Sequence, residues 1–297
     1  MPILSIPSPS RGQIDLGPLS IHAYGLMLLL AIVAATVLTG IRWTRRGGDW
    51  DLVFQVAVWG VAFGIIGARL YHVITSWDEV PDQWWGVFAV WKGGLGVWGG
   101  IFLGVVAGAV VVKRSGNSVL AFMDAVAPGL LLAQAIGRWG NWFNQELYGK
   151  PTDLPWGLEI DIQHRPDNLD LLQQETFHPV FLYEFTWNLI GVVVLLLLDK
   201  FVRFRPPALF ALYVAWYTAF RAYEETLRID PSHEWFGFRL NFYVSIVLFA
   251  LSMGFFIYWQ FIRKEGTGSR PSVRRKPRPI PKGPAMAVPK GRVRPRR

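Results

Sequence analysis

A cluster of polar side chains follows directly on a strongly apolar stretch, in the segment GRWGNWFNQELYG. If the preceding helix continues into this segment, Arg138, Asn141 and Gln145 share one helical face, and Glu146 lies about 80° around it. An arginine alone would be explained by snorkelling of a helix end into the headgroup layer. Two asparagines, a glutamine and a glutamate close by each need a partner if they are buried. This density of polar groups favours a site that recognises an anion.

A second polar stripe lies near the end of a later apolar run. Tyr217, Arg221, Glu224 or Glu225, and Arg228 recur at i, i+4, i+7 or i+8, and i+11, which is one helical face. Ionisable groups at membrane depth are functional candidates, although a structural arginine–glutamate ladder is the alternative. Two arginine faces indicate a shared ligand with a negative group. A phospholipid headgroup is such a ligand, because arginine binds phosphate through two parallel hydrogen bonds.

Three further polar residues carry weaker signals. Tyr24 stands at one end of the first apolar run, where an aromatic residue of the interfacial belt is the default. Arg69 lies late in the second run, where it reaches either the same pocket or only the interface. His178 precedes a proline at the start of a later run, where helix initiation and chemistry both account for it. The other histidines show no metal-ligand spacing, and we expect neither a metal nor a cofactor.

The elements that must position these residues are membrane helices. The chain of 297 residues is 52% hydrophobic and only 17% charged, with a mean hydropathy of +0.29. Seven apolar segments are about as long as a bilayer-crossing helix requires. They cover roughly residues 21–41, 52–74, 92–112, 118–137, 179–198, 207–222 and 240–262. We therefore predict an all-α polytopic membrane protein with about seven transmembrane helices.

The charges between these segments predict the orientation of the chain. Basic residues follow the first, third, fifth and seventh segments, whereas the loop after the second carries acidic residues. Positive residues mark the cytoplasmic side, so we expect the N-terminus outside and the C-terminus in the cytoplasm. The long loop of residues 138–178 is then external. Its length and its prolines predict a small external cap.

The end of the chain differs in composition from the membrane domain of residues 1–262. Residues 263–297 contain thirteen Lys/Arg and one acidic residue, a net charge of +12, which leaves −3 for the remainder of the +9 total. This Pro-rich segment has no apolar period, and we expect it disordered near anionic headgroups. A nucleic-acid-binding arm is the weaker alternative, because the segment contains no aromatic residue for base stacking. We predict no nucleic-acid partner.

A glycine motif in the third segment has two interpretations. Gly94, Gly96 and Gly99 match the G-x-G-x-x-G pattern of dinucleotide sites, but that pattern requires a preceding strand and a soluble βαβ unit. A membrane helix follows here, so we reject a dinucleotide site. Glycines also recur at every fourth position from Gly96 to Gly108, a stripe that lets two membrane helices approach closely. We predict helix packing for this stripe.

Two classes of membrane protein fit parts of this pattern. A transporter or channel would line a pathway with polar helix faces, but it predicts inverted repeats and broken helices at the midplane. The chain shows no internal repeat, and its charges gather at one edge of the membrane. A lipid-binding scaffold would explain the arginines and the basic tail, but not the dense group of asparagine, glutamine and glutamate residues.

The segment GRWGNWFNQELYG closely resembles the G-R-x-x-N-F-x-N-x-E-x-x-G motif of bacterial prolipoprotein diacylglyceryl transferases. Four flanking pieces agree in order: LGPLSIHAYGLM, WKGGLGVWGG, HPVFLYE and YTAFRAYEETLR. The resemblance covers about residues 1–262. It implies a multi-pass enzyme of the bacterial cytoplasmic (inner) membrane with its active site toward the outer face. Such an enzyme transfers the diacylglyceryl group of phosphatidylglycerol to the lipobox cysteine of preprolipoproteins, the first step of lipoprotein maturation, and releases glycerol phosphate.

The resemblance also implies roles for individual residues. Arg138 would bind the headgroup phosphate together with Arg221, and the chain's own lack of cysteine fits an acceptor thiol supplied by the substrate. Asn141, Glu146 and Gly149 would shape the first motif, and Tyr24, Tyr217, Arg221, Glu225 and Arg228 would form the second wall. From the residue pattern alone, Arg69 is a further candidate for a supporting role. The candidate bases are Glu146, Tyr217 and His178.

One departure from the family concerns the general base. In enterobacterial members a histidine proposed as the base stands where this chain has Trp98. Tryptophan cannot take a proton from a thiol. Either the base lies elsewhere in this chain, or that histidine is not obligatory.

Overall fold

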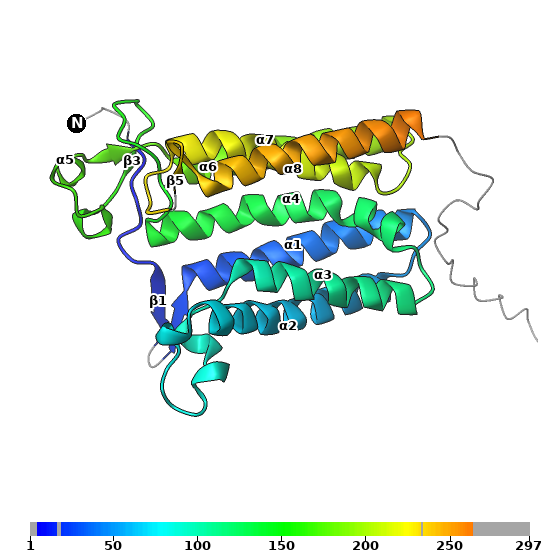
Figure 1. The fold of residues 1–297 in the computed structure, drawn as a ribbon, viewed down its shortest axis with the longest axis horizontal. Helices are drawn as coiled ribbons and strands as arrows, with labels where there is room; N and C mark the ends of the chain where they lie inside the picture. Colours follow the sequence, from blue (N-terminus) through cyan, green and yellow to red (C-terminus); the bar gives the residue numbers. More distant parts are fainter. Residues whose placement is uncertain (1–4, 17–18, 233, 264–297) are drawn as a thin grey trace, which may run out of the picture.

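Seven long helices lie side by side in the computed structural model, which describes residues 5–16, 19–232 and 234–263 (Figure 1). They are α1 (Ala23–Arg45), α2 (Trp50–Thr75), α3 (Val97–Arg114), α4 (Val119–Asn144), α6 (Val180–Phe201), α7 (Ala208–Leu227) and α8 (Leu240–Ile257), the last continued by a π-helical turn (Tyr258–Ile262). Within the described residues, all but α7 are long and apolar enough to cross a membrane. Helix α7 carries three charged residues in its last two turns. The predicted polytopic all-α fold is confirmed. The predicted disordered tail lies outside the described residues, except for Arg263.

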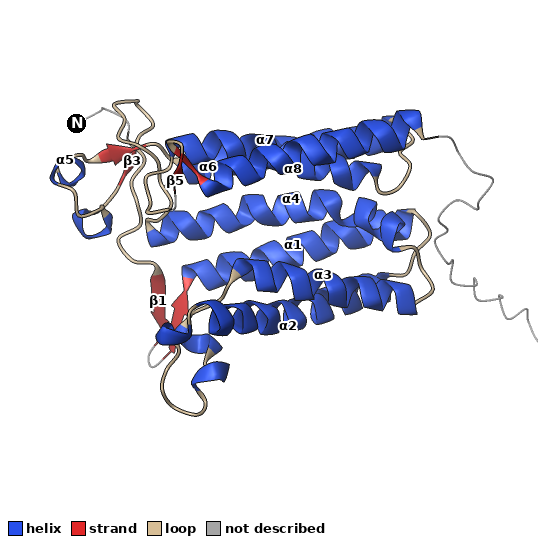
Figure 2. Cartoon of the chain, in the orientation of Figure 1, coloured by secondary structure: helices blue, strands red, loops and turns tan. Residues whose placement is uncertain are grey.

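Strands and short helices gather at one end of the helix bundle (Figure 2). Three antiparallel pairs occur there: β1 (Gln13–Leu16) with β2 (Leu19–His22), β3 (Leu158–Glu159) with β4 (Thr176–Phe177), and β5 (Glu234–Trp235) with β6 (Phe238–Arg239). Short α5 (Leu169–Leu172) and the turns Trp77–Glu79, Gly86–Phe88, Val90–Lys92 and Ile162–His164 complete this end. In the segment between α4 and α6, Tyr148, Leu158, Ile160 and Phe177 form one apolar cluster with Phe181 of α6, so the predicted cap packs against the helix ends.

Three helix boundaries differ most from those expected from hydropathy. Helix α3 begins at Val97 rather than at 92, because Gly93 and Gly94 adopt positive φ angles of 86° and 69° that end a preceding turn. Helix α4 continues to Asn144, so the cap begins beyond it rather than at 138. Helix α7 continues to Leu227. Helices α4 and α7 extend past their apolar segments because the polar side chains at their ends have partners inside the protein.

Glycines allow α2 and α3 to pack closely. A Cβ atom on Gly67 would lie 2.2 Å from the carbonyl oxygen of Gly99, and one on Gly104 would lie 3.0 Å from that of Gly60. Gly100 likewise faces α2, where a Cβ atom would meet a backbone oxygen at 3.2 Å. The predicted packing role of the glycine stripe is confirmed. The close approach fixes how the two helices pack, together with a hydrogen bond from the Gly96 N–H at the start of α3 to the carbonyl oxygen of Ala68 in α2 at 2.8 Å.

We expect Gly67→Ala to lower the stability of the protein by roughly 1–3 kcal/mol, because the added methyl group must push α2 and α3 apart. Thermal unfolding of the purified protein in detergent measures this change. Gly25→Ala in α1 is the matched control, because a Cβ atom there meets nothing within 4 Å. It is expected to leave the unfolding midpoint unchanged or slightly raised. Equal effects of the two substitutions would contradict tight packing at Gly67.

Ion pairs and a helix-capping hydrogen bond join the helices at the end of the bundle opposite to the strands, where the described chain ends at Arg263 (Figure 1). Arg42 and Arg46 of α1 contact Asp199 of α6 at 2.9 and 2.7 Å. Asp124 of α4 accepts a hydrogen bond from the backbone N–H of Phe210 at 2.9 Å, which satisfies a free donor in the first turn of α7. The basic residues that follow α1, α3 and α6 all lie at this end, away from the cap.

Candidate functional site

A chain of hydrogen bonds leads along the end of α4. Arg138 donates from Nη1 to Oδ1 of Asn141 at 3.2 Å, and Asn141 donates from Nδ2 to Oε1 of Glu146 at 2.7 Å. The helix continues through Asn144, so Arg138 and Asn141 share the predicted face. Asn141 is buried and uses both ends of its amide. The three residues therefore act as one connected group.

Gln145 does not join this group, which differs from the prediction. The helix ends at Asn144, and Gln145 adopts a left-handed conformation with a φ of 51°. Its side chain turns toward the N-terminal segment and the cap, where it donates to the Pro9 carbonyl and to Asp161 at 3.0 and 2.7 Å. The reason is the change of backbone direction at the helix end, which takes position 145 off the helical face.

Glu184 of α6 joins the two arginine faces. Its carboxylate Oε2 lies 2.6 Å from Nη2 of Arg138 and 3.9 Å from Nη1 of Arg221. Only 1% of its side chain is exposed, and Asn188 one turn further on donates to its other oxygen at 3.4 Å. The expected convergence of Arg138 and Arg221 is therefore present. Sequence reasoning had assigned no role to Glu184, although an acidic residue inside the apolar run FLYEF was the signal.

The stripe on α7 is a ladder of ion pairs. Arg221 contacts Glu224 at 3.0 Å and Glu225 at 2.5 Å, and Arg228 contacts Glu225 at 3.5 Å. Both glutamate side chains are fully buried. Tyr217 lies within electrostatic range of Arg138 and Arg221 and of the buried carboxylates of Glu184 and Glu224. The structural ladder and the convergent site are both present, because Arg221 belongs to each.

Exposure separates the arginines into two groups. Arg138 and Arg221 keep 15% and 17% of their side chains exposed, whereas Arg228 and Arg239 keep only 7% and 6%. A guanidinium has five N–H donors, and those of Arg138 and Arg221 are only partly used by the carboxylates. These two side chains are therefore the ones that a negatively charged ligand can reach. Arg228 and Arg239 are more fully buried.

Further ion pairs support the α7 ladder at the loop between α7 and α8. Arg239, just before α8, contacts Glu225 at 2.9 Å and Asp230 at 2.7 Å. Arg228 contacts the same Asp230 at 2.8 Å. The loop between α7 and α8 is thus closed by two arginines on one carboxylate. Sequence reasoning missed Arg239, because it lies eleven positions beyond Arg228 and outside the helical stripe.

We expect Asp230→Asn to destabilise the protein by about 2 kcal/mol near neutral pH. Burial alone raises the pKa of Asp230, but hydrogen bonds from Arg239 and Arg228 outweigh it and lower the pKa to about 2. A depressed pKa stabilises the fold above the unfolded value near 4, and this contribution is lost as the pH falls toward 2. The difference in unfolding midpoint between wild type and variant should therefore be full at pH 6 and shrink below pH 4. A constant difference would contradict the charge pairing.

Two close packing contacts hold residues 137–149 against neighbouring segments. A Cβ atom on Gly149 would lie 2.9 Å from Cβ of His178, and the Gly149 backbone pairs with that of Arg228 in an antiparallel bridge. Tyr24 of α1 packs over Gly140, where a Cβ atom would lie 2.6 Å from its ring. Tyr24 is also within electrostatic range of Arg138. Gly149 is thus a packing residue at the cap, and Tyr24 borders the arginine group.

Three residues singled out from the sequence lie apart from this arginine group. Arg69 donates to backbone carbonyls of the loop between α2 and α3, among them Gly86 at 2.5 Å and Gly93 at 2.9 Å. It holds that loop and contacts none of the site residues. The His178 ring contacts the Tyr183 hydroxyl at 3.1 Å. Trp98 stands on the first turn of α3 with 57% of its surface exposed.

A polar cavity of about 300 Å³ lies beside Glu146. It is lined by Pro9, Ser10, Gly12, Phe143, Asn144, Gln145, Glu146 and His164. The cavity therefore joins the N-terminal segment, the end of α4 and the cap. Glu146 belongs both to this cavity and to the hydrogen-bond chain from Arg138, so it connects an open polar space with the guanidinium groups. This arrangement can hold an anion and a second, polar reactant next to each other.

Comparison with known proteins gives consistent matches. The family model "Prolipoprotein diacylglyceryl transferase" matches residues 11–258. The phosphatidylglycerol–prolipoprotein diacylglyceryl transferase of Frankia alni is 49% identical over 84% of this chain and 66% of its own length. Transferase 2 of Streptomyces coelicolor is 49% identical over 84% of this chain and 79% of its own. The enzyme of Cutibacterium acnes is 47% identical over 91% of this chain and 90% of its own.

Proposed function

Since the chain belongs to the prolipoprotein diacylglyceryl transferase family and has that transferase activity, we propose that the arginine group is its active site. The diacylglyceryl donor is phosphatidylglycerol, and the acceptor is the lipobox cysteine of a preprolipoprotein. The observation that carries this proposal is the meeting of Arg138 and Arg221, from two different helices, on the buried carboxylate of Glu184. A buried carboxylate fixes both guanidinium groups in place before a substrate arrives.

The phosphate of the donor lies between the exposed faces of Arg138 and Arg221. The cysteine thiolate attacks the glycerol carbon that carries the phosphate ester. A carbon–sulfur bond forms, the carbon–oxygen bond breaks, and glycerol phosphate leaves with the bonding electrons. The two guanidinium groups stabilise the charge that develops on the departing phosphate. They also favour the thiolate over the thiol, and the thiolate is the nucleophile.

Glu146 is the base that takes the thiol proton. It lies on the hydrogen-bond chain from Arg138 through Asn141 and borders the open polar cavity. Tyr217 is the second candidate, because it lies within electrostatic range of both arginines. His178 is a weaker candidate, because its ring contacts Tyr183 rather than the arginine group. Trp98 has no group that accepts a proton.

The active site faces outward from the bacterial cytoplasmic (inner) membrane in this proposal. The basic residues at the far end of α1, α3 and α6 then lie in the cytoplasm, and the cap lies outside. This orientation supports the reaction, because exported precursors emerge on the outer face. The N-terminus is outside and the C-terminal segment is cytoplasmic.

We expect Glu146→Gln to slow transfer by about a hundredfold or more, because glutamine cannot accept the proton but preserves the shape of the side chain. His178→Gln is the matched control and should change the rate by less than about threefold. The His178 ring contacts the Tyr183 hydroxyl at 3.1 Å rather than the arginine group, so its replacement leaves the contacts of the two arginines unchanged. Initial rates at saturating donor measure both effects. A large loss in the histidine variant alone would assign the base to His178.

The direct test is transfer of labelled diacylglyceryl from phosphatidylglycerol to a lipobox peptide by the purified protein. Formation of the lipid-modified peptide, with release of glycerol phosphate, is the expected result. A protein that binds the lipid but transfers nothing would be a lipid-binding scaffold, and the proposed site would be abandoned. Transfer to a peptide whose cysteine is replaced by serine would contradict the thiolate mechanism.

A further inference from the structure

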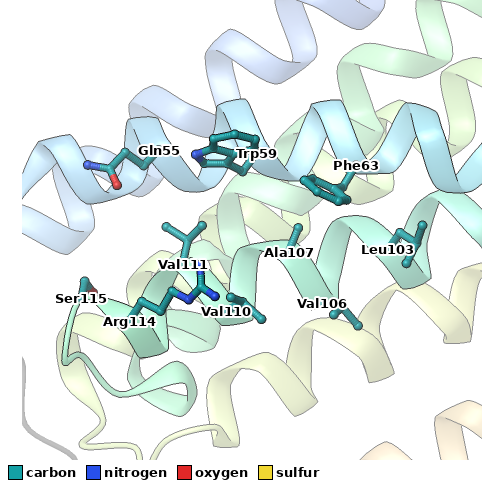
Figure 3. A pocket seen from close by; sticks show the side chains of 10 residues that line it. All are labelled: Gln55, Trp59, Phe63, Leu103, Val106, Ala107, Val110, Val111, Arg114 and Ser115. Carbon is teal, nitrogen blue, oxygen red and sulfur yellow. The ribbon is translucent and has the colours of Figure 1, made fainter.

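A lipid-facing groove lies between α2 and α3, toward the basic end of the bundle. Its volume is about 660 Å³, and Figure 3 shows the side chains that line it. Trp59 and Phe63 come from α2, and the other apolar walls are Leu103, Val106, Ala107, Val110 and Val111 of α3. The small side chain of Ala107 leaves room in the middle of the groove. Three polar residues, Gln55, Arg114 and Ser115, lie at one end only.

The length and polarity of this groove match one lipid molecule. Leu103 and Arg114 are eleven residues apart on α3, a rise of about 16 Å, which is about half of a hydrocarbon core of ~30 Å. An acyl chain in one leaflet spans this depth. The polar end coincides with the end of the helices, where headgroups lie. The groove thus offers an apolar channel and a polar terminus in the order that a phospholipid requires.

Arg114 gives the polar end its charge preference. Its side chain turns back along α3 toward Val110 and Val111 (Figure 3), and it has no hydrogen-bond or ion-pair partner among the described residues. Gln55 is exposed across from it on α2. An unpaired guanidinium at a headgroup position favours a phosphate. The basic segment that follows Arg263 is a poor occupant, because its charge has the same sign.

We propose that this groove binds an anionic glycerophospholipid of the membrane, with its phosphate on Arg114 and an acyl chain along Trp59 and Phe63. The site lies at the end of α3 opposite to the loop that joins α2 to α3, about 25 Å along the helix from Val97. It is therefore a second lipid site, distinct from the arginine group that holds the donor. The bound lipid is not consumed, and it covers the apolar surface beside the glycine-packed helix pair.

The test uses the full chain in phosphatidylcholine vesicles that contain a small share of phosphatidylglycerol with a photoactivatable group on the acyl chain. After illumination and digestion, mass spectrometry locates the labelled peptides. Label on the α2 and α3 peptides is expected, and excess unlabelled phosphatidylglycerol should remove it whereas phosphatidylcholine should not. Label near α4 and α7 reports on the donor site separately, so failure of one proposal leaves the other standing.

Variants give the groove its own controls. Arg114→Gln should lower the label on α2 and α3 by about tenfold, and Ala107→Trp should lower it similarly by filling the groove. Lys113→Gln removes the same charge from an exposed position that does not line the groove, and it should change the label by less than about twofold. Equal loss in the Lys113 and Arg114 variants, or equal competition by phosphatidylcholine, would mean ordinary boundary lipid and would overturn the proposal.

The remaining alternative is a second copy of this chain seated on the groove. The chain has no cysteine, so Ala107→Cys places a single thiol there. Efficient disulfide formation between two chains in vesicles would show that protein covers the groove and would overturn the lipid proposal. Absence of such cross-links, together with the specific label, supports it.

Discussion

Replacing Arg138 with alanine is expected to reduce diacylglyceryl transfer by about a thousandfold, the effect of removing a main donor to a developing anion. The substitution removes the phosphate ligand on α4. It also leaves Glu184 buried with Arg221 as its remaining cation, at 3.9 Å, so the second arginine is less firmly positioned. Measurement of initial rates with labelled phosphatidylglycerol and a lipobox peptide tests this.

The control for this variant is the replacement of another arginine that pairs with a carboxylate, at the far end of the bundle. Arg46 contacts Asp199 at 2.7 Å, and Arg42 contacts the same carboxylate. Arg46→Ala therefore removes one ion pair but leaves Asp199 paired. Transfer per inserted protein should stay within about twofold of wild type. Normal turnover by the Arg138→Ala variant would show that Arg138 does not bind the phosphate of the donor, although the protein would still be a transferase.

Replacing Arg221 with alanine should lower transfer by a hundredfold or more, roughly the effect of losing a second charge-assisted donor. The expected loss has two sources. The phosphate loses its partner on α7, and the buried Glu224 and Glu225 lose the contacts at 3.0 and 2.5 Å that balance their charges. Arg221→Lys separates the two sources, because lysine supplies a charge but not the planar pair of donors.

The lysine variant should recover much of the thermal stability but only a small part of the rate. Stability is measured by unfolding in detergent, and the rate by the same transfer assay. Thr226→Ala, a few residues further along α7, is the control. It should change the transfer rate by less than about twofold and leave the unfolding midpoint nearly unchanged. Full recovery of the rate by lysine would show that positive charge suffices, and bidentate binding of the phosphate would then be discarded.

The residues of the candidate site could largely be named from the sequence, because polar side chains at the edge of apolar runs are costly unless they have a role. Arg138, Asn141, Arg221 and Arg228 were named in this way. Glu184 was not given its role, because one acidic residue in an apolar run also fits the start of a helix. Arg239 carried no signal at all, since its partners come from another helix and from the loop before it.

The direction of side chains at helix ends could not be predicted from the sequence either. Gln145 fits the polar face only if the helix continues through it, and the left-handed conformation at that position sends its side chain to Asp161 instead. Arg69 was equally open, because an arginine late in a membrane helix reaches either a pocket or a loop. The structure assigns it to backbone carbonyls. Hydropathy could not decide either case, because it has no information on partners distant in the chain.

The sequence by itself determined the class of this protein and the order of its membrane helices. Apolar runs of bilayer length leave few alternatives, since backbone polar groups in a membrane must be satisfied within each helix. Motif spacing determined which residues share a helical face. Only the tertiary structure decided that the face on α4 meets the face on α7, through Glu184 on α6. That meeting depends on how three helices pack, and packing is a property of all their surfaces together rather than of any one segment.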